Sequence, residues 1–191
     1  MENTLSKKER LILANQYEIL AKLAEDDYEK KQFNNLRDIF TSGYSRYYSL
    51  ATEHFSDEVS DEECKFVVDV LNMYRDLYYS WYRNKDAHEV INEKTVLFKG
   101  FDLNDEIEVK YYSFYKFLVN DFGRFEEIKE FIAEGKIEDF NSHGSGPSMR
   151  QLNLMLSKWQ EIKNRDEYNY SDDLALEEIS EIINAHIDHA Y

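Results

Sequence analysis

One long apolar stretch, from Ser60 to Trp81 (SDEECKFVVDVLNMYRDLYYSW), constrains the fold more than any other part of the chain. Its large apolar side chains recur at helical spacing, which predicts a helix with a buried stripe made of Val67, Val70, Leu71, Tyr74, Leu77, Tyr78 and Trp81. Phe66 and Met73 lie off this stripe, so the helix is apolar on more than one face. Ser60 and Glu63 have the spacing of a capping box, which predicts where the helix begins. Such a helix needs neighbours on several sides.

The charge of the chain limits its partners. It has 39 acidic and 23 basic residues among 191, which gives a formal net charge of −16. A surface with this average charge repels the phosphates of nucleic acids and the headgroups of anionic membranes. We therefore expect neutral, cationic or apolar partners, and neither nucleic acid nor a membrane. An acidic mimic of nucleic acid, with carboxylates spaced like phosphates along one exposed face, is a further hypothesis.

The single cysteine, Cys64, rules out an internal disulfide framework and is typical of a protein in a reducing compartment. The first residues, MENTLSKKER, lack the apolar core of a signal peptide, and no apolar run reaches the roughly 18 residues of a membrane span. We therefore expect a cytoplasmic protein. Free cysteine is among the most buried residue types, so Cys64 is interpreted as a packing residue of the central helix rather than as a nucleophile.

The rest of the chain is predicted to be mostly helical as well. The predicted helices cover residues 7–24, a stretch ending at Gly43, residues 44–55, 60–82 and 103–119, a short piece before Gly135, a stretch after Pro147, and a last helix capped by Ser171 or Asp173. Residues 84–93 are expected to form a loop, and residues 95–98 a short extended segment or a buried connector. We therefore expect one mostly all-α domain over residues 1–191, built around two long buried helices.

Several separated motifs resemble one known family. ERLILANQYEIL, LNMYRDLYYSW, FKGFDLNDEIE, FNSH followed by MRQLNLML, and EISEIINA resemble, in this order, the YfbU family of bacterial proteins. The resemblance covers nearly the whole chain. It implies little about activity, because the family is largely uncharacterised. A small-ligand-binding role is implied by a similar domain that occurs joined to a helix-turn-helix module, although no separate DNA-binding module is discernible in this chain and no catalytic residue follows from the resemblance.

Two short polar segments, GFDLNDE (100–106) and FNSH (140–143), form the strongest candidate binding site. The candidate ligand-binding residues carry carboxylate, amide, hydroxyl or imidazole groups: Asp102, Asn104, Glu106, Ser142 and His143. If the two segments meet, these groups can hold a cation, an amine or a hydroxyl ligand. The interpretation favoured by the pattern is structural, because Asp102 or Asn104 can cap the next helix while Glu106 complements its dipole. An EF-hand is excluded, since Ile107 stands in place of its invariant glycine.

The segment RNKDAH, directly after the central helix, is the second candidate site. Arg83, Asn84 and His88 resemble the motif of the HEPN ribonucleases, helical proteins that use an Arg and a His at a dimer interface to cleave RNA. In this alternative, Arg83 stabilises a phosphate and His88 moves a proton, without a metal. A solvated helix end explains the same residues, since Arg83 and Lys85 favour the negative pole of the helix. The net charge also disfavours RNA, so we rank this hypothesis second.

The sequence predicts neither a cofactor nor a metal. His186 and His189 have a spacing that suits two metal ligands on a helix, but a chain end is poorly placed to hold a metal. The segments YYSWY and YYSFY are expected to line the core and to leave some hydroxyls at an oligomer interface. We therefore predict a non-enzymatic ligand-binding or protein-interaction domain that forms a homo-oligomer, with the ribonuclease as the enzymatic alternative.

Overall fold

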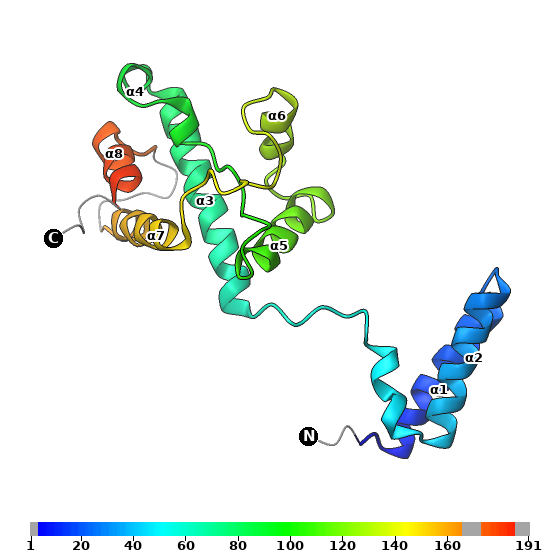
Figure 1. Cartoon of the computed structure of the whole chain (residues 1–191). Helices are drawn as coiled ribbons and strands as arrows, with labels where there is room; N and C mark the ends of the chain where they lie inside the picture. Colours follow the sequence, from blue (N-terminus) through cyan, green and yellow to red (C-terminus); the bar gives the residue numbers. More distant parts are fainter. Residues whose placement is uncertain (1–3, 166–172, 186–191) are drawn as a thin grey trace. The chain divides into compact units, whose positions relative to one another are not determined.

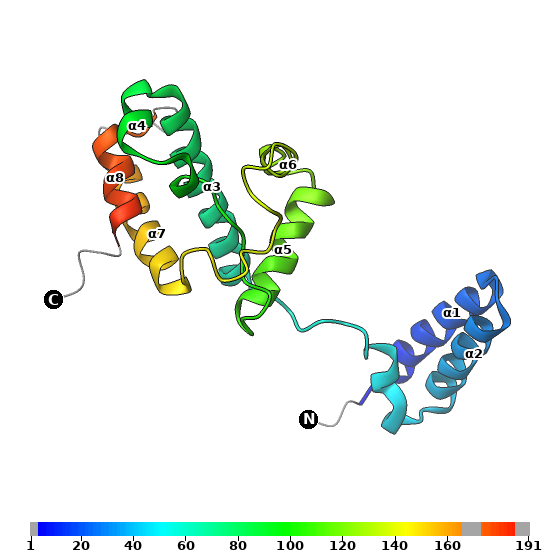
Figure 2. The same ribbon diagram turned by 45° about the horizontal axis from the view of Figure 1, so that its top comes forward.

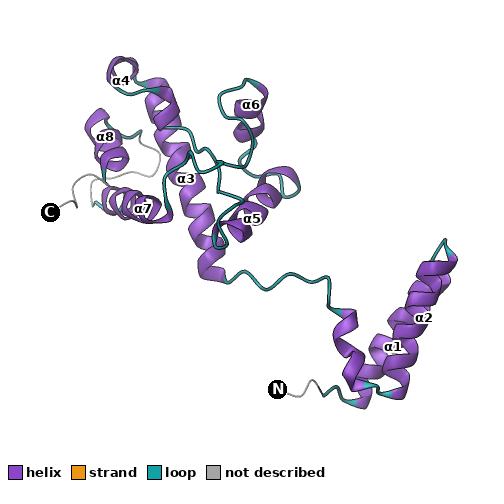
Figure 3. Cartoon of the chain, viewed as in Figure 1, coloured by secondary structure: helices purple, strands orange, loops and turns teal. Residues whose placement is uncertain are grey.

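Helices and their connecting loops make up the structure. The computed structural model describes residues 4–165 and 173–185, and this part of the chain contains helices and no strand (Figure 3). The all-α prediction is therefore confirmed. The chain divides into two compact units, Met1–Glu58 (unit 1) and Val59–Tyr191 (unit 2). This division leaves the expected single domain over residues 1–191 a prediction.

Unit 1 begins with two antiparallel helices, α1 (Lys7–Leu23) and α2 (Asp27–Ser42), which lie side by side (Figure 1). Ser6 caps α1 through a capping box with Glu9, in which the Glu9 amide donates to the Ser6 hydroxyl at 3.3 Å and the Ser6 amide donates to the Glu9 carboxylate at 2.7 Å. Gly43 ends α2 in the left-handed conformation, with φ +75°, as its position in the sequence predicts.

After this turn the chain forms a 3₁₀ helix, η1 (Ser45–Ala51), within the segment 44–55 that was predicted to be helical. The helix is therefore present but shorter than predicted, and it has the tighter 3₁₀ form that is common in short pieces. The core of unit 1 is small. Its buried members are Ala14, Phe40 and Tyr48.

Unit 2 is organised around α3 (Asp61–Arg83). The predicted capping box is confirmed, since the Glu63 amide donates to the Ser60 hydroxyl at 3.2 Å and the Ser60 amide to the Glu63 carboxylate at 2.9 Å. Every residue of the predicted stripe is buried, and Met73 is fully buried on another face. In both views α5 and α6 lie on one side of α3, and α7 and α8 lie on the other (Figures 1 and 2). These helices are α5 (Glu108–Asn120), α6 (Glu127–Ala133), α7 (Met149–Lys163) and α8 (Leu176–Asn184).

Polar contacts attach the surrounding segments to α3. Arg75 forms a bidentate ion pair with Glu127 of α6, with N–O distances of 2.6 and 2.7 Å, and this hydrogen bonding raises the pKa of Arg75. Asp76 accepts a hydrogen bond from the Trp159 indole of α7 at 3.0 Å. The Ser80 hydroxyl, buried within α3, accepts the backbone amide of Leu174 at 2.9 Å. The central helix is therefore fixed by directional contacts as well as by packing.

The expected loop over residues 84–93 was wrong, because a short helix, α4 (Lys85–Val90), starts there. Asn84 ends α3 and also caps α4, its side-chain oxygen accepting the amides of Asp86 at 3.1 Å and Ala87 at 3.4 Å. One side chain thus restarts the helix within a polar segment that has no apolar periodicity.

The apolar run at residues 95–98 is the buried connector rather than a strand. It follows a 3₁₀ turn, η2 (Glu93–Thr95), and Val96 has φ −97° and ψ 1°, which is not an extended conformation. At the other end of unit 2, the last helix begins after Ala175. Ser171 lies outside the described residues, and Asp173 instead forms an ion pair with Arg83.

A substitution at Gly100 tests how closely the end of the buried connector approaches the backbone of Phe140. Its φ is +99°, and a Cβ there would lie 2.0 Å from the backbone carbonyl oxygen of Phe140. We expect Gly100→Ala to lower the free energy of unfolding by about 3–5 kcal/mol, from backbone strain and overpacking combined. Gly123→Ala is the matched control, because Gly123 also has positive φ, +69°, but open space around its Cβ position. It should cost only about 1–2 kcal/mol. Urea unfolding measures both, and equal losses would contradict the close approach at Gly100.

Tyr115 of α5 carries a buried hydroxyl that has no hydrogen-bond partner among the described residues. Burial raises its pKa far above the usual range. Tyr115→Phe removes only this hydroxyl, so we expect the free energy of unfolding to rise by about 1–3 kcal/mol. Tyr78→Phe is the control, because the Tyr78 hydroxyl accepts a hydrogen bond from Lys136 at 2.9 Å and its loss should destabilise the protein. Thermal or urea unfolding that shows Tyr115→Phe to be the less stable of the two would contradict this account.

Candidate functional site

The two polar segments singled out in the sequence meet in space. Phe101 and Asn141 form an isolated parallel bridge, and the Ser142 amide donates to the Phe101 carbonyl oxygen at 3.1 Å. The side-chain oxygen of Asn141 also accepts the amide of Leu103 at 3.2 Å and that of His143 at 3.0 Å. Residues 100–106 and 140–143 are therefore held together by backbone and Asn141 contacts.

In the first segment, residues 100–106, the aspartate side chains accept hydrogen bonds from nearby backbone amides. Asp102 accepts the Asn104 amide at 2.9 Å and the Asn104 side-chain amide at 3.0 Å. Asp105, rather than Asp102 or Asn104, accepts the amides just before and at the start of α5, those of Ile107 at 2.8 Å and Glu108 at 3.0 Å. The helix α5 starts at Glu108, later than the predicted position near residue 103, and its N-cap residue Ile107 provides no side-chain cap. Glu106 is exposed.

The two candidate residues of the second segment, Ser142 and His143, have different surroundings. His143 has φ +48° and its ring Nδ1 lies 3.2 Å from the Asn141 side-chain nitrogen, so the imidazole is held within its own turn. Ser142 is buried and lines a cavity of about 240 Å³ together with Lys94, Lys99 and Lys136. Asp102, Asn104, Glu106 and His143 are not among the residues that line this cavity. The binding role of these five residues stays a prediction.

Arg83, Asn84 and His88 are close in sequence but are held by separate contacts. Arg83 forms an ion pair with Asp173, which raises the pKa of Arg83 and lowers that of Asp173. Asn84 caps α4. The Nε2 atom of His88 lies 3.0 Å from the Trp81 carbonyl oxygen, and its ring lies 4.3 Å from the Trp81 ring. These contacts account for the segment structurally, and its catalytic interpretation stays a prediction.

The thiol of Cys64 is placed for packing. Its sulfur lies 3.8 Å from the Val59 carbonyl oxygen, and partial burial, with Asp61 and Glu63 nearby, raises its pKa. A raised pKa lowers the thiolate fraction and therefore opposes nucleophilic chemistry. Within residues 4–165 and 173–185, no group of three His, Cys, Asp or Glu side chains is arranged to hold a metal ion. His186 and His189 lie outside the described residues.

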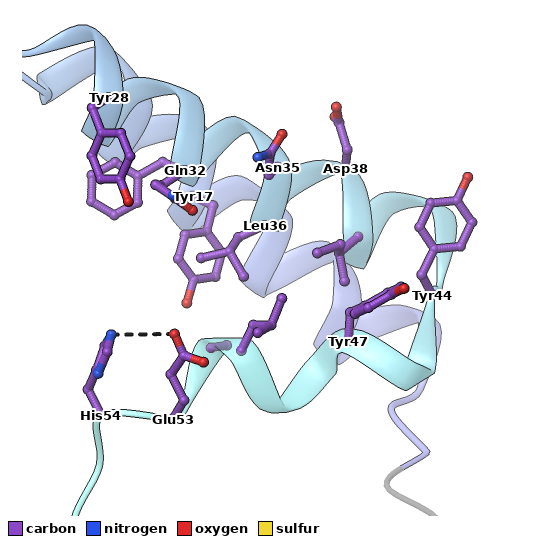
Figure 4. Close-up of a pocket in the computed structure, with 14 residues that line it drawn as sticks. Tyr17, Tyr28, Gln32, Asn35, Leu36, Asp38, Tyr44, Tyr47, Glu53 and His54 are labelled. Carbon is purple, nitrogen blue, oxygen red and sulfur yellow. Dashed lines mark ion pairs between the residues drawn. The ribbon is translucent and has the colours of Figure 1, made fainter.

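A larger site, the aromatic groove, lies in unit 1 between α2 and η1 (Figure 4). Stacked rings underlie it: Tyr17 packs on Phe40 with ring centroids 5.7 Å apart, and Phe40 packs on Tyr48 at 5.2 Å. The groove has a volume of about 880 Å³, within the range of small-molecule sites. Its lining is mostly aromatic and aliphatic, with a few polar groups: Tyr17, Tyr28, Gln32, Phe33, Asn35, Leu36, Asp38, Ile39, Tyr44, Tyr47, Leu50, Ala51, Glu53 and His54.

The groove lining contains two carboxylates, Asp38 and Glu53, and no lysine or arginine. Figure 4 shows the rings of Tyr17, Tyr28 and Tyr47 turned into the groove, whereas Asp38 points away from η1. Glu53 stands at one end, where its carboxylate lies 3.5 Å from the Nε2 atom of His54. Burial raises the pKa of Tyr17, so this hydroxyl stays neutral. The groove therefore combines aromatic faces with an acidic end.

The sequence analysis did not single out this groove. Its residues come from α1, α2, η1 and the residues beside η1. They converge because the chain turns back between α1 and α2 and again at Gly43, so that η1 returns along α2. The available signal was a second set of aromatic residues in the first quarter of the chain, Tyr28, Tyr44 and Tyr47, which lie outside the predicted inner faces. Without the turn geometry, this set does not indicate a site.

The buried carboxyl group of Glu108 predicts a pH effect. Burial raises its pKa, and its Oε2 atom accepts the Asp102 amide at 2.8 Å. A raised folded-state pKa means that the contribution of Glu108 to stability is full below its unfolded pKa and is lost as the pH rises through the folded pKa. Glu108→Gln keeps an acceptor and cannot ionise, so we expect it to gain stability relative to the wild type between pH 4 and pH 7 in urea unfolding.

Glu106→Gln controls for net charge, since it makes the same change on an exposed residue two positions earlier. If the difference between Glu108→Gln and the wild type does not rise with pH beyond that of the control, burial of Glu108 has no energetic effect.

None of the described helices is long and apolar enough to cross a bilayer.

Comparison with known proteins places the chain in a family. A family model described as the YfbU domain matches residues 3–185. The chain is also similar to the UPF0304 protein MJECS11 of Methanocaldococcus jannaschii, with 38% identity over 183 residues, which cover 95% of this chain and 99% of the relative. The predicted family is thus confirmed by both findings, and the chain belongs to the YfbU family.

Proposed function

We propose that the protein is a non-enzymatic binding protein whose aromatic groove in unit 1 takes a small organic cation with a flat apolar body. The observation that carries this proposal is the groove itself, a volume of about 880 Å³ lined by four tyrosines, with Glu53 at one end. Sites for small molecules are concave and mostly apolar, with few polar groups that fix the orientation of the ligand.

Aromatic faces favour a flat ligand that carries a positive charge. Tyrosine rings attract cations through the negative face of the ring, and they also stack on flat apolar groups. Tyr28, Tyr44 and Tyr47 are exposed in the described structure, so a ligand would cover apolar surface that is now in contact with water. Covering this surface supplies the nonspecific part of the affinity.

The charge distribution supports a cation rather than an anion. Glu53 is the carboxylate at the end of the groove, and the chain as a whole carries a formal charge of −16. Asp38 contributes less, because Arg37 already donates two hydrogen bonds to its Oδ1 atom at 3.0 and 2.8 Å. An amine at the Glu53 end meets an acceptor whose basic neighbour in the lining is His54, at 3.5 Å, and no lysine or arginine lines the groove.

The other functional hypotheses stay predictions. The ribonuclease hypothesis needs Arg83 and His88 to act on one phosphate, and the present contacts of these residues do not favour it. A cytoplasmic location and a homo-oligomer also stay predictions. The proposal for the groove depends on neither.

Three matched indole probes test the proposal: tryptamine, its neutral analogue tryptophol, and anionic indole-3-acetate. We expect tryptamine to bind about 3–30 times more tightly than tryptophol in calorimetry, because only the amine gains cation–π and carboxylate contacts. Indole-3-acetate should bind most weakly. Glu53→Gln should reduce the preference for tryptamine over tryptophol to about twofold or less, and Tyr28→Ala should weaken both probes.

Matched variants separate the groove from general effects. Tyr28 is 72% exposed, so its truncation should not unfold unit 1, and Tyr82→Ala, at a tyrosine that is 60% exposed in α3, is its control. Glu58→Gln removes a negative charge from unit 1 outside the groove and controls for Glu53→Gln. If none of the three probes binds, or if Glu58→Gln and Glu53→Gln reduce the amine preference equally, the groove is not a site for organic cations.

A further inference from the structure

The helix α1 has a second apolar face that no residue of unit 1 covers. Its buried residues are Ala14 and Ala21, and Ala14 belongs to one cluster with Phe40 of α2 and Tyr48 of η1. Ile12, Ile19 and Leu23 are 60%, 52% and 71% exposed. At about 100° per residue they form a single stripe on the side of α1 opposite Ala14 and Ala21. The aromatic groove does not include these residues, so the stripe is a separate surface.

The spacing of this stripe is that of a helix–helix seam. Ile12, Gln16, Ile19 and Leu23 follow one another at intervals of four, three and four residues, which is the pattern of the two core positions of a heptad. Gln16 is also exposed, and a single polar residue at such a position is common where it sets register. The pattern therefore favours packing of α1 against another helix.

The small core of unit 1 gives a physical reason for a partner. Only a few of its residues are fully buried, and a unit of 58 residues buries a smaller share of its surface than a larger domain does. Burial of the three large apolar side chains of the stripe against a partner would add hydrophobic stabilisation of the same order as the burial of a few core side chains.

Charges at the two ends of α1 indicate what the partner is. Lys7 and Lys8 stand at its first turn, and Glu25 and Asp27 follow its last. All four are exposed, and among the described residues no ion pair engages them. A second copy of α1 running antiparallel brings basic end against acidic end at both ends of the seam. A parallel copy would place like charges together.

We propose that two copies of the chain pair through α1, antiparallel and related by a two-fold axis. In the register centred between Gln16 and Ile19, Ile12 of one copy lies opposite Leu23 of the second copy. The same register places the Lys8 end of one α1 beside the turn that follows Leu23 of the second copy, where Glu25 and Asp27 lie. An interface of this kind is self-complementary, as two-fold symmetry requires, since each contact occurs twice.

The oligomeric state of the full chain tests the pairing. We expect sedimentation velocity over a concentration series to show a dimer, and Ile19→Glu to raise its dissociation constant about a hundredfold or more, because two carboxylates would enter the seam. Val90→Glu places the same charge at an apolar residue of α4 that is 68% exposed, and it should leave the dimer intact. Circular dichroism confirms that both variants keep their helices.

Disulfide trapping tests the direction of the pairing. In a Cys64→Ser background, a mixture of Ile12→Cys and Leu23→Cys chains should cross-link through a disulfide under mild oxidation. Either variant alone should not, because in the antiparallel register two copies of position 12 lie about 16 Å apart along the axis. A monomeric wild type, a dimer unaffected by Ile19→Glu, or efficient cross-linking of Ile12→Cys to itself would each overturn the proposal.

Discussion

Burial of the wide apolar face of α3 is the constraint on which the rest of unit 2 depends. Val67, Val70, Met73 and Leu77 are fully buried, and at about 100° per residue they spread over roughly a third of the helix circumference. An apolar helix of this width is stable in water only when helices cover it from both sides, and α5 and α6 on one side and α7 and α8 on the other do so. Because the body of α3 is committed to the core, binding surfaces have to be carried by other segments.

Sequence motifs predicted the structure correctly where a side chain caps the backbone next to it. Ser6 and Ser60 each form the capping box that their spacing predicted, and Gly43 ends α2 as expected. The features that the sequence failed to predict also depend on single residues. The helix α4 starts from a single residue, Asn84, in a polar segment, and six residues are too few to show a period. Pro147 lies two positions before α7, which begins at Met149, because Ser148 supplies the cap.

The candidate sites show where prediction from sequence ends. The two polar segments were expected to form one site, and they do lie in contact. The side-chain oxygens of Asp102 and Asn141, however, already accept hydrogen bonds from nearby backbone amides. A sequence lists such groups without showing which backbone donors already occupy them. The groove was missed for the opposite reason. Tyr17 and Tyr28 are brought together by the turn between α1 and α2, and Tyr47 joins them through the reversal at Gly43. Their pattern along the chain shows no periodicity that predicts a shared surface.

The self-contained core of unit 1 also affects how the protein is made. Ala14, Phe40 and Tyr48 and the residues packed around them all precede position 52, so this unit is complete before the first residue of α3 is translated. Domains generally fold as units in the order of synthesis. Unit 1 can therefore reach its final form while the chain is still attached to the ribosome, and α1 is exposed at that stage. If two copies of the chain pair through α1 as proposed, this helix is accessible to a second copy before unit 2 is complete.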